Sequence, residues 1–209
     1  MIKCLLSLLI GYFCGSFLTA EVVARKVTGK SIFEIGDGNP GMANVGHELG
    51  SKAALACPAG DILKTLVPVL VLNALVDTPG WQIITAWTGL GATLGHLYPF
   101  WHHFKGGKGV TTIASTIILM SPLWGILSGV VGVATIVLSG YLSVAAVVAI
   151  VFYTLAICVA GLPWDCRLVS LVFVLLTCRA HWSKLRGIRN GTTHRASLSV
   201  KFWNKVRGN

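Results

Sequence analysis

The segment FKGGKGV at residues 104–110 has the clearest potential for chemistry, and it stands directly before a long apolar run. It holds two lysines and three glycines: Lys105, Lys108, Gly106, Gly107 and Gly109. Glycine lets the backbone approach a ligand closely, and a helix beginning near Val110 would add free N–H groups and the positive end of its dipole. We therefore predict a phosphate cradle here, different in spacing from the nucleotide-binding P-loop. A positively charged anchor loop is the alternative, although anchoring does not require three glycines.

The segment GDGNPGMAN at residues 36–44 is a second candidate anion site. Its glycines and asparagines are Gly36, Gly38, Gly41, Asn39 and Asn44. Glycine permits positive φ, so successive backbone N–H groups can point at one anion, and asparagine adds amide donors. An ordinary interhelical loop is the alternative interpretation, because glycine, asparagine and proline are also common turn residues.

Ionisable side chains also lie inside apolar segments, where they are costly. Asp61 and Lys64 are three residues apart, so they share a helix face and can pair. His96 and His181 each begin a polar run. We predict that Asp61, Lys64 and His96 support a site; for the first two, a structural ion pair that orients the helix is the alternative. No cluster of carboxylates or cysteines accompanies the histidines, so we expect no metal site, and no nucleotide motif suggests a cofactor.

Two common enzyme signatures are missing from the sequence. No histidine is followed by an aspartate five positions later, the arrangement of one large class of glycerolipid acyltransferases, and no G-x-S-x-G elbow occurs. A His-Asp acyltransferase and a serine hydrolase are therefore disfavoured.

The composition indicates which elements must position these residues. Hydrophobic residues make up 54% of the 209 residues and charged residues 11%, with a mean hydropathy of +0.75, whereas soluble domains are about 25% charged. This is typical of an integral membrane protein. The apolar segments are 4–24, 53–76, 81–100, 110–121, 123–138, 141–162 and 167–180. We predict an all-α bundle of about seven transmembrane helices in one domain over 1–209.

Two details of this prediction remain open. The short pieces 110–121 and 123–138 meet at Ser121-Pro122, and they are either two short helices that form a hairpin or one kinked span. If 110–138 is re-entrant, the chain crosses five times. Residues 3–20 resemble a signal peptide, but we favour a first transmembrane helix because the apolar run continues without a clear cleavage site.

The placement of charge predicts the orientation. The net charge is +10, and the cations concentrate at 25–52, at 105–108 and in a basic tail at about 181–209, whereas the connection DTPG at 77–80 has none. This alternation is typical of the positive-inside rule, so we expect an outside N-terminus, a cytoplasmic C-terminus and no nucleic-acid partner. The six cysteines show no paired spacing and are interpreted as buried free thiols.

Three stretches resemble the motifs of a known family, the acyl-phosphate-dependent glycerol-3-phosphate acyltransferases of bacteria (the PlsY family). GDGNPGMANV is similar to the family's G-S-G-N-x-G-A-T-N-V, and GHLYPFWHHFKGGKGVTT to its G-H-x-x-P-x-x-x-x-F-K-G-G-K-G-V-A-T. RAHWSKLRGIRNGTT loosely resembles its H-x-x-N-I-x-R-L-x-x-G-T-E. The resemblance covers most of the chain. It implies seven transmembrane helices in the bacterial plasma membrane, with the motifs on the cytoplasmic side.

The resemblance also implies a reaction. The family moves a fatty acyl group from acyl phosphate to glycerol 3-phosphate, giving lysophosphatidic acid and phosphate, without a covalent acyl-enzyme. By position, Lys105 and Lys108 would hold phosphate and stabilise the charge on the leaving group. Asn39, Asn44 and the loop glycines would donate hydrogen bonds, and Ser143 and His181 match polar motif positions. We expect acyl phosphate, glycerol 3-phosphate and the bilayer as partners, no cofactor, and a monomer.

Several motif positions depart from the family pattern: Asp37, His47, Gly140, Lys184, Gly187 and Thr193. An acid at 37 repels phosphate unless it is protonated or turned away, and a histidine at 47 in place of arginine removes a bidentate contact. The middle motif is intact while the flanking motifs have drifted. Two alternatives therefore stay open: a related acyltransferase with another acceptor, and a non-catalytic lipid-binding or transport protein.

Overall fold

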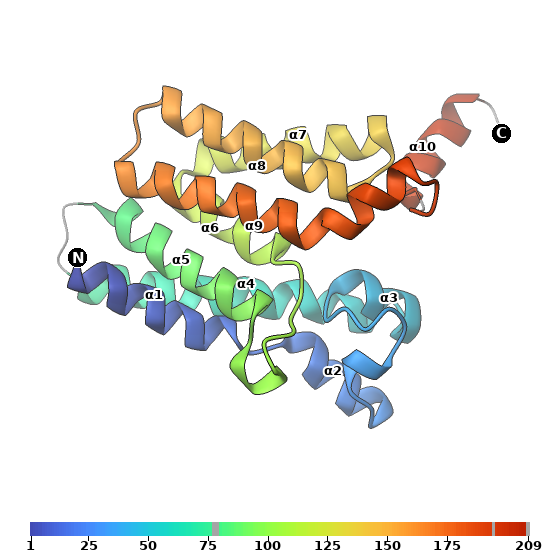
Figure 1. Ribbon diagram of the computed structural model, residues 1–209, viewed down its shortest axis with the longest axis horizontal. Helices are drawn as coiled ribbons and strands as arrows, with labels where there is room; N and C mark the ends of the chain where they lie inside the picture. Colours follow the sequence, from blue (N-terminus) through green and yellow to red (C-terminus); the bar gives the residue numbers. More distant parts are fainter. Residues whose placement is uncertain (77–79, 194, 208–209) are drawn as a thin grey trace. The chain divides into compact units, whose positions relative to one another are not determined.

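The computed structural model describes residues 1–76, 80–193 and 195–207, and within these ranges every regular element is helical (Figure 1). The elements, in chain order, are α1 (Ile2–Gly15), α2 (Thr19–Thr28), η1 (Ile32–Glu34), α3 (Met42–Leu49), α4 (Ser51–Leu75), α5 (Trp81–Leu97), η2 (Phe100–His102), α6 (Val110–Met120), α7 (Pro122–Ser139), α8 (Leu142–Val159), α9 (Trp164–Arg189) and α10 (Ser197–Arg207). The all-α prediction is confirmed. Three of the four residues of the predicted outer connection DTPG, 77–79, lie outside the described ranges.

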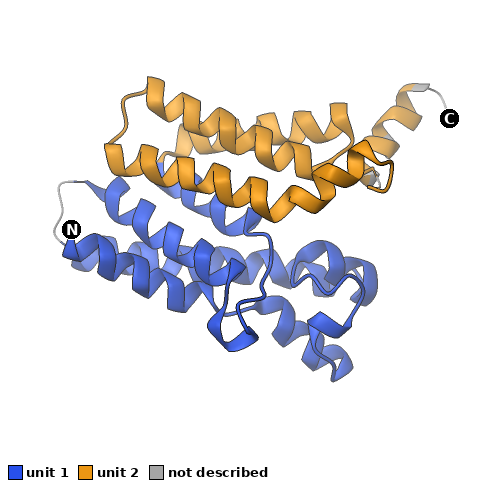
Figure 2. Ribbon diagram, in the orientation of Figure 1, with its two compact units in different colours: residues 1–120 blue, residues 121–209 orange. Residues whose placement is uncertain are grey.

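The chain divides into two compact units, residues 1–120 and 121–209 (Figure 2). The first unit contains α1 to α6 and both glycine-rich segments, and the second contains α7 to α10. The expectation of a single domain over 1–209 stays a prediction.

Five helical segments of the described chain are long and apolar enough to cross a membrane. They are Ile2–Thr28, Ser51–Leu75, Pro122–Ser139, Leu142–Val159 and Trp164–Arg189. Helix α5 has 17 residues and α6 has 11, which is short for the ~20 residues of a typical span. All seven predicted apolar segments coincide with helices, but the number that cross the bilayer stays a prediction.

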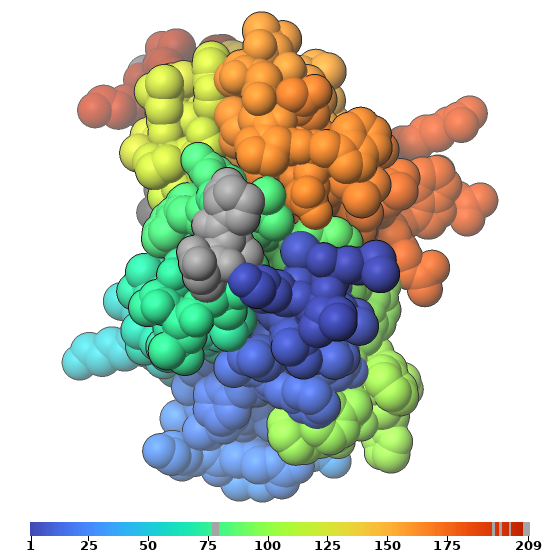
Figure 3. Space-filling view, turned by 90° about the vertical axis from the view of Figure 1, so that its left-hand side faces the viewer, coloured from blue at the N-terminus to red at the C-terminus, as the bar shows by residue number. Residues whose placement is uncertain are grey.

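Helices α1 and α5 pack with their backbones almost in contact, because glycines line both sides. A Cβ at Gly11 or Gly15 would overlap the backbone of α5, and a Cβ at Gly91 or Gly95 would overlap the backbone of α1. Small residues permit such close approach between membrane helices. The first apolar segment is thus an integral part of the first unit, and Figure 3 shows it (dark blue) on the surface of this unit, near the lime-green connection that follows α5.

Several boundaries differ from the sequence-based expectation. The break at Ser121-Pro122 separates two helices, α6 and α7, with Pro122 at the first position of α7, where proline is well tolerated. Helix α9 starts three residues before the apolar run 167–180 and ends nine residues after it, because polar residues continue its last turns. Helix α3 begins inside the predicted loop 36–44, and the basic tail contains a helix, α10.

The prediction of buried thiols is only partly right. All six cysteines are free, but only Cys57 and Cys166 are buried, while Cys158 is exposed. An apolar run on a membrane helix places residues on lipid-facing as well as packed faces, so its hydrophobicity does not show which side is buried.

Candidate active site

The glycine–lysine segment 105–109 folds back over the C-terminal end of α5. The backbone N–H of Gly107 donates to the carbonyl oxygen of His96 at 3.0 Å. A Cβ at Gly106 would overlap this same carbonyl oxygen, and a Cβ at Gly107 would overlap the Nε2 atom of the His96 ring. Both glycines are therefore required by close packing, and the segment lies directly on the imidazole.

Helix α6 begins at Val110, as predicted from the sequence. Gly109 has a φ of +74° and its carbonyl oxygen accepts from the Ile113 N–H and the Thr112 hydroxyl, both at 2.9 Å. The N–H groups of the first helical turn have no acceptor inside the helix, so they are available to an anion. Lys105 is exposed and Lys108 is half-buried beside this turn. The arrangement has the parts of an anion site: a helix N-terminus, a close backbone and two ammonium groups.

Asp61 and Lys64 form the predicted pair, and His96 joins them. The Lys64 Nζ lies 2.9 Å from Asp61 Oδ1 and 2.8 Å from His96 Nδ1, and it donates to the Phe17 carbonyl oxygen at 2.8 Å. All three side chains are buried. The cluster connects α4 and α5 to the segment that follows α1. It therefore holds in place the end of α5 against which the glycine–lysine segment packs.

The contacts of Lys64 favour one tautomer of the His96 ring. A lysine ammonium has three donors and no acceptor, and its three partners here are a carboxylate, a carbonyl and the Nδ1 nitrogen. Asp61 Oδ1 is farther from Nδ1, at 3.4 Å, so the ammonium bridges these two acceptors. If the ammonium donates to Nδ1, a neutral ring carries its proton on Nε2, the nitrogen that faces Gly107.

The second glycine-rich segment is held by its own side chains. Asn44 Nδ2 donates to the Ile35 carbonyl oxygen at 2.8 Å, and Asn44 Oδ1 accepts from the Asp37 N–H at 3.1 Å. The Asp37 carboxylate accepts from the Asn39 N–H at 3.1 Å. Gly36 and Gly38 have φ of +57° and +69°, values that favour glycine. Asn44 thus has a bracing role that the sequence did not reveal, while the Asn39 side chain remains half-buried at the loop.

Glu21 is a further structural residue of this region. Its buried carboxylate accepts from the Ser31 hydroxyl, the Ile32 N–H at 2.8 Å and the Arg25 guanidinium at 2.6 Å. This holds the start of η1, which leads into the loop at 36–44. The sequence signal was weak, because Glu21 stands next to the cation cluster and resembles an ordinary interfacial residue.

The two glycine-rich segments belong to the same unit and are connected through aromatic rings. Phe33, just before the first segment, and His102, just before the second, have ring centroids 5.4 Å apart. Trp101 Nε1 donates to the Ser16 carbonyl oxygen at 3.1 Å. The connection after α5 is therefore anchored both to the end of α1 and to η1.

The remaining predicted site residues lie in the second unit. Ser143 is buried near the start of α8, and His181 is buried in the last third of α9. Thr177 precedes His181 by one turn and is also buried. Within the described chain, the hydroxyl groups of Ser143 and Thr177 have no hydrogen-bond partner, which is costly unless a ligand or water completes them. Thr177 was not predicted, because a single threonine in an apolar run carries no motif.

Comparison with known proteins places the chain in a family. The sequence model described as glycerol-3-phosphate acyltransferase matches residues 5–191. The chain belongs to this glycerol-3-phosphate acyltransferase family. It is 31% identical to a glycerol-3-phosphate acyltransferase of Aquifex aeolicus, over 92% of this chain and 99% of the relative. It is 33% identical to glycerol-3-phosphate acyltransferase 1 of Lactobacillus johnsonii, over 81% of each chain.

Solved structures agree with this assignment. A crystal structure of PlsY, described as an integral membrane glycerol 3-phosphate acyltransferase in its glycerol 3-phosphate form, matches with a TM-score of 0.82, 31% identity and coverage of 95% of this chain and 98% of that one. The lysophosphatidic acid form matches with a TM-score of 0.81. The resemblance to PlsY inferred from the motifs is confirmed.

Three of the departures from the family pattern contact one another in the last motif. Thr193 donates its hydroxyl to the Lys184 carbonyl oxygen at 2.8 Å and its N–H to the Gly187 carbonyl oxygen at 3.2 Å. A Cβ at Gly187 would overlap the Thr193 hydroxyl. The two departures are therefore in contact, and a side chain at 187 would require the Thr193 hydroxyl to move. His47 is exposed and contacts Glu48, and nothing in the structure explains its substitution.

Proposed function

We propose that the protein transfers a fatty acyl group from acyl phosphate to glycerol 3-phosphate, giving lysophosphatidic acid and inorganic phosphate in phospholipid synthesis. The observation that carries this proposal is the intact glycine–lysine segment, which lies on the His96 ring and leads directly into the start of α6. Family membership supports the acceptor, since the solved relatives are described in glycerol 3-phosphate and lysophosphatidic acid forms.

In this reaction an acceptor hydroxyl oxygen attacks the acyl carbonyl carbon, and the bond between this carbon and the phosphate oxygen breaks. Negative charge passes to the departing phosphate, where Lys105, Lys108 and the N-terminal turn of α6 would stabilise it. The hydroxyl proton leaves with a phosphate oxygen, so no enzyme-bound acyl group is required. Holding both substrates together would contribute much of the rate.

The other residues receive supporting roles in this proposal. Asn39 and the backbone at Gly36, Gly38 and Gly41 would bind a phosphate or the acyl carbonyl, with Asn44 as a positioning residue. For Ser143 and His181, we propose substrate-binding and catalytic roles on their match to polar motif positions of the family. His96 would donate through Nε2–H, and Lys64 and Asp61 would keep this tautomer in place.

The proposal includes a topology. With seven crossings the N-terminus lies outside and the C-terminus lies in the cytoplasm, so both glycine-rich segments face the cytoplasm of a bacterial cell, where phosphorylated substrates are made. The cation-rich connections support this orientation. We further propose that the protein acts as a monomer.

A second candidate is acyl transfer from acyl phosphate to a different acceptor. The observation that favours it is the exposed Asp37 in the first glycine-rich segment. A carboxylate repels a phosphorylated acceptor, whereas a neutral polyol would not suffer this repulsion. The intact segment at 105–109 keeps the acyl-phosphate half of the reaction in both candidates.

The test is phosphate release from palmitoyl phosphate by the detergent-purified protein, with and without glycerol 3-phosphate. Release that requires glycerol 3-phosphate and yields lysophosphatidic acid supports the proposal. Release that requires glycerol or another polyol instead supports the second candidate. Binding of palmitoyl phosphate without any release, across a panel of acceptors, would indicate a non-catalytic lipid-binding protein and overturn both.

A further inference from the structure

The C-terminal segment has a structural role outside the acyltransferase family match, which ends at residue 191. Helix α10 packs on the last turn of α7. The Ser199 hydroxyl and the Trp203 Nε1 both donate to the Val137 carbonyl oxygen, at 3.1 Å and 3.0 Å, and the Ala196 N–H donates to the Gly140 carbonyl oxygen at 2.7 Å. These bonds satisfy carbonyl groups at the C-terminal end of α7 that have no partner within the helix. They therefore fix the position of α10 on α7.

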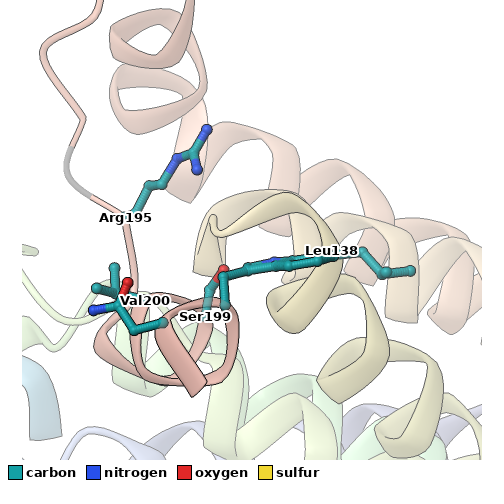
Figure 4. Close-up of a pocket in the computed structure, with 6 residues that line it drawn as sticks. Leu138, Arg195, Ser199 and Val200 are labelled. Atoms are coloured by element: carbon teal, nitrogen blue, oxygen red, sulfur yellow. The ribbon is translucent and has the colours of Figure 1, made fainter. Parts of the chain in front are cut away.

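A small open hollow of about 250 Å³ forms where α10 meets α7 (Figure 4). Its lining residues are Leu138, Arg195, Ser199, Val200, Trp203 and Asn204. Figure 4 shows the Arg195 side chain extending away from Ser199 and Val200. The guanidinium has no hydrogen bond or ion pair with any residue that the structure describes. The hollow thus presents a cation, an amide and an indole to a ligand.

The charge around the hollow selects an anion. Residues 166–209 contain nine lysines and arginines and no aspartate or glutamate. A uniform field of one sign attracts ligands of the opposite sign, and here no acidic side chain of the segment neutralises it. The occupant that complements this surface therefore carries negative charge.

The exposed face of α10 indicates that this anion belongs to a membrane surface. Leu198, Phe202 and Val206 are spaced by four residues, so they form one stripe along the helix. They are exposed by 50%, 44% and 59%. Lys205 is exposed and lies next to this stripe by helical position. An apolar stripe bordered by cations is typical of a helix that lies in the headgroup region of a bilayer.

We propose that residues 195–207 form a docking site for anionic phospholipid head groups, with the apolar stripe in the membrane interface and Arg195 binding the lipid phosphate. The guanidinium group suits phosphate because its planar fork can donate two hydrogen bonds. Gly140 makes room for this arrangement. A Cβ there would stand 3.2 Å from Arg195 Cγ and Cδ, and its φ of +82° favours glycine.

Native mass spectrometry of the full, detergent-purified chain titrated with dioleoyl phosphatidylglycerol tests the proposal. We expect Arg195→Gln to weaken binding of the first lipid about tenfold, as loss of one charged hydrogen bond should. Arg189→Gln removes the same charge from an exposed residue outside the hollow and should weaken binding at most about twofold. Equal losses in the two variants would overturn the proposal.

Two further arms identify the ligand. Dioleoyl phosphatidylcholine, which carries the same phosphate but no net charge, should bind more weakly than phosphatidylglycerol; equal binding overturns the proposal. Millimolar inorganic phosphate should leave the bound lipid in place, whereas competition would show that the site takes free phosphate.

The apolar stripe has its own test in lipid nanodiscs. Trypsin should cleave after Lys205 more slowly in discs that contain phosphatidylglycerol than in discs of phosphatidylcholine alone. Phe202→Ser should remove this protection, because the side chain no longer enters the interface. Identical cleavage in both kinds of disc would show that α10 does not dock on anionic lipid.

Discussion

The two glycine-rich segments of the first unit are built in different ways. In residues 105–109, Gly106 and Gly107 are required because a neighbouring backbone or ring fills the space where a Cβ would stand, and Gly109 also has a positive φ. In residues 36–44, two glycines are required by positive φ, and the loop is held together by the side chains of Asn44 and Asp37. One segment is fixed by close packing against α5, and the other is fixed by side-chain hydrogen bonds.

This difference explains where the sequence has departed from the family pattern. A contact between backbones tolerates no added atoms, so the first kind of loop keeps its sequence if it keeps its shape. A loop braced by side chains can exchange one acceptor for another: the Asp37 carboxylate occupies a bonding role that a serine hydroxyl could also perform. Five predictions test the proposed chemistry, the close packing, the ion pair beneath residues 105–109 and the departures from the family pattern.

Removing the charge of Lys108, in the closely packed segment 105–109, should have the largest effect on activity. We expect Lys108→Ala to lower kcat by about 10²–10³-fold, as loss of a donor that stabilises developing negative charge does. Phosphate release from palmitoyl phosphate measures it. Lys52→Ala, which removes an exposed charge at the start of α4, should be close to wild type. Full activity of the Lys108 variant would exclude its proposed role.

Adding one methyl group to the packed segment should be almost as damaging. In Gly107→Ala the new Cβ overlaps the His96 ring, and the segment must move. A displacement of this size near the reacting atoms costs about 100-fold in activity. Gly129→Ala is the matched control, because its Cβ in α7 meets nothing within 4 Å. If the Gly107 variant were as active as the control, the packing argument would be wrong.

The cluster of Asp61, Lys64 and His96, against which segment 105–109 packs, should contribute to stability. Lys64→Met leaves the buried Asp61 carboxylate without its partner, which costs about 3–5 kcal/mol in the free energy of unfolding. The double variant Asp61→Asn with Lys64→Met should recover part of this loss, because neither charge remains. Thermal inactivation in detergent measures both. A double variant that is less stable than the single one would contradict the pairing.

The contact between Lys64 and His96 in the same cluster leads us to expect one spectroscopic signature. Nitrogen-15 NMR of the wild-type protein, with His96 assigned by comparison with His96→Gln, should show a neutral ring protonated on Nε2. Protonation on Nδ1 would mean that Lys64 does not donate to this ring. This experiment tests the position of a proton, which activity alone does not report.

Restoring the family's serine at position 37 should have the smallest effect. Asp37→Ser keeps an acceptor for the Asn39 N–H but removes the carboxylate. We expect the KM for glycerol 3-phosphate to fall about fivefold, the ~1 kcal/mol of one like-charge contact in water, with kcat unchanged. Asp37→Asn should give a similar fall. A higher KM in both variants would indicate that the carboxylate assists the acceptor.

Much of the fold followed from the sequence. Every apolar segment is helical, because runs such as 141–162 are long and apolar, although the segment 4–24 divides into α1 and α2. The ends were less predictable: α9 continues to Arg189, where polar residues sustain a helix that no longer needs an apolar environment. The glycine contacts between α1 and α5 carry no local signal, since they depend on which helix lies opposite.

The candidate site was predicted by residue type but not by contact. The spacing of Asp61 and Lys64 placed them on one face, and the structure confirms their pairing. The contacts of Lys64 with His96 and with the Phe17 carbonyl could not be predicted from the sequence, because both partners lie far from Lys64 along the chain. The bracing role of Asn44 was missed for a different reason: an amide that binds its own loop has the same sequence signal as one that binds a ligand.

The contact between α1 and α5 also sets an order of events during synthesis. Tyr12 donates its hydroxyl to the Tyr98 carbonyl oxygen, 86 residues later, and the paired glycines of the two helices lie about as far apart along the chain. At about 5–20 residues per second, the ribosome needs roughly 4–17 s to produce the partner after α1 has emerged. Until then α1 exposes a glycine groove that no neighbour fills, so the first unit can close only when residues near 97 have left the ribosome.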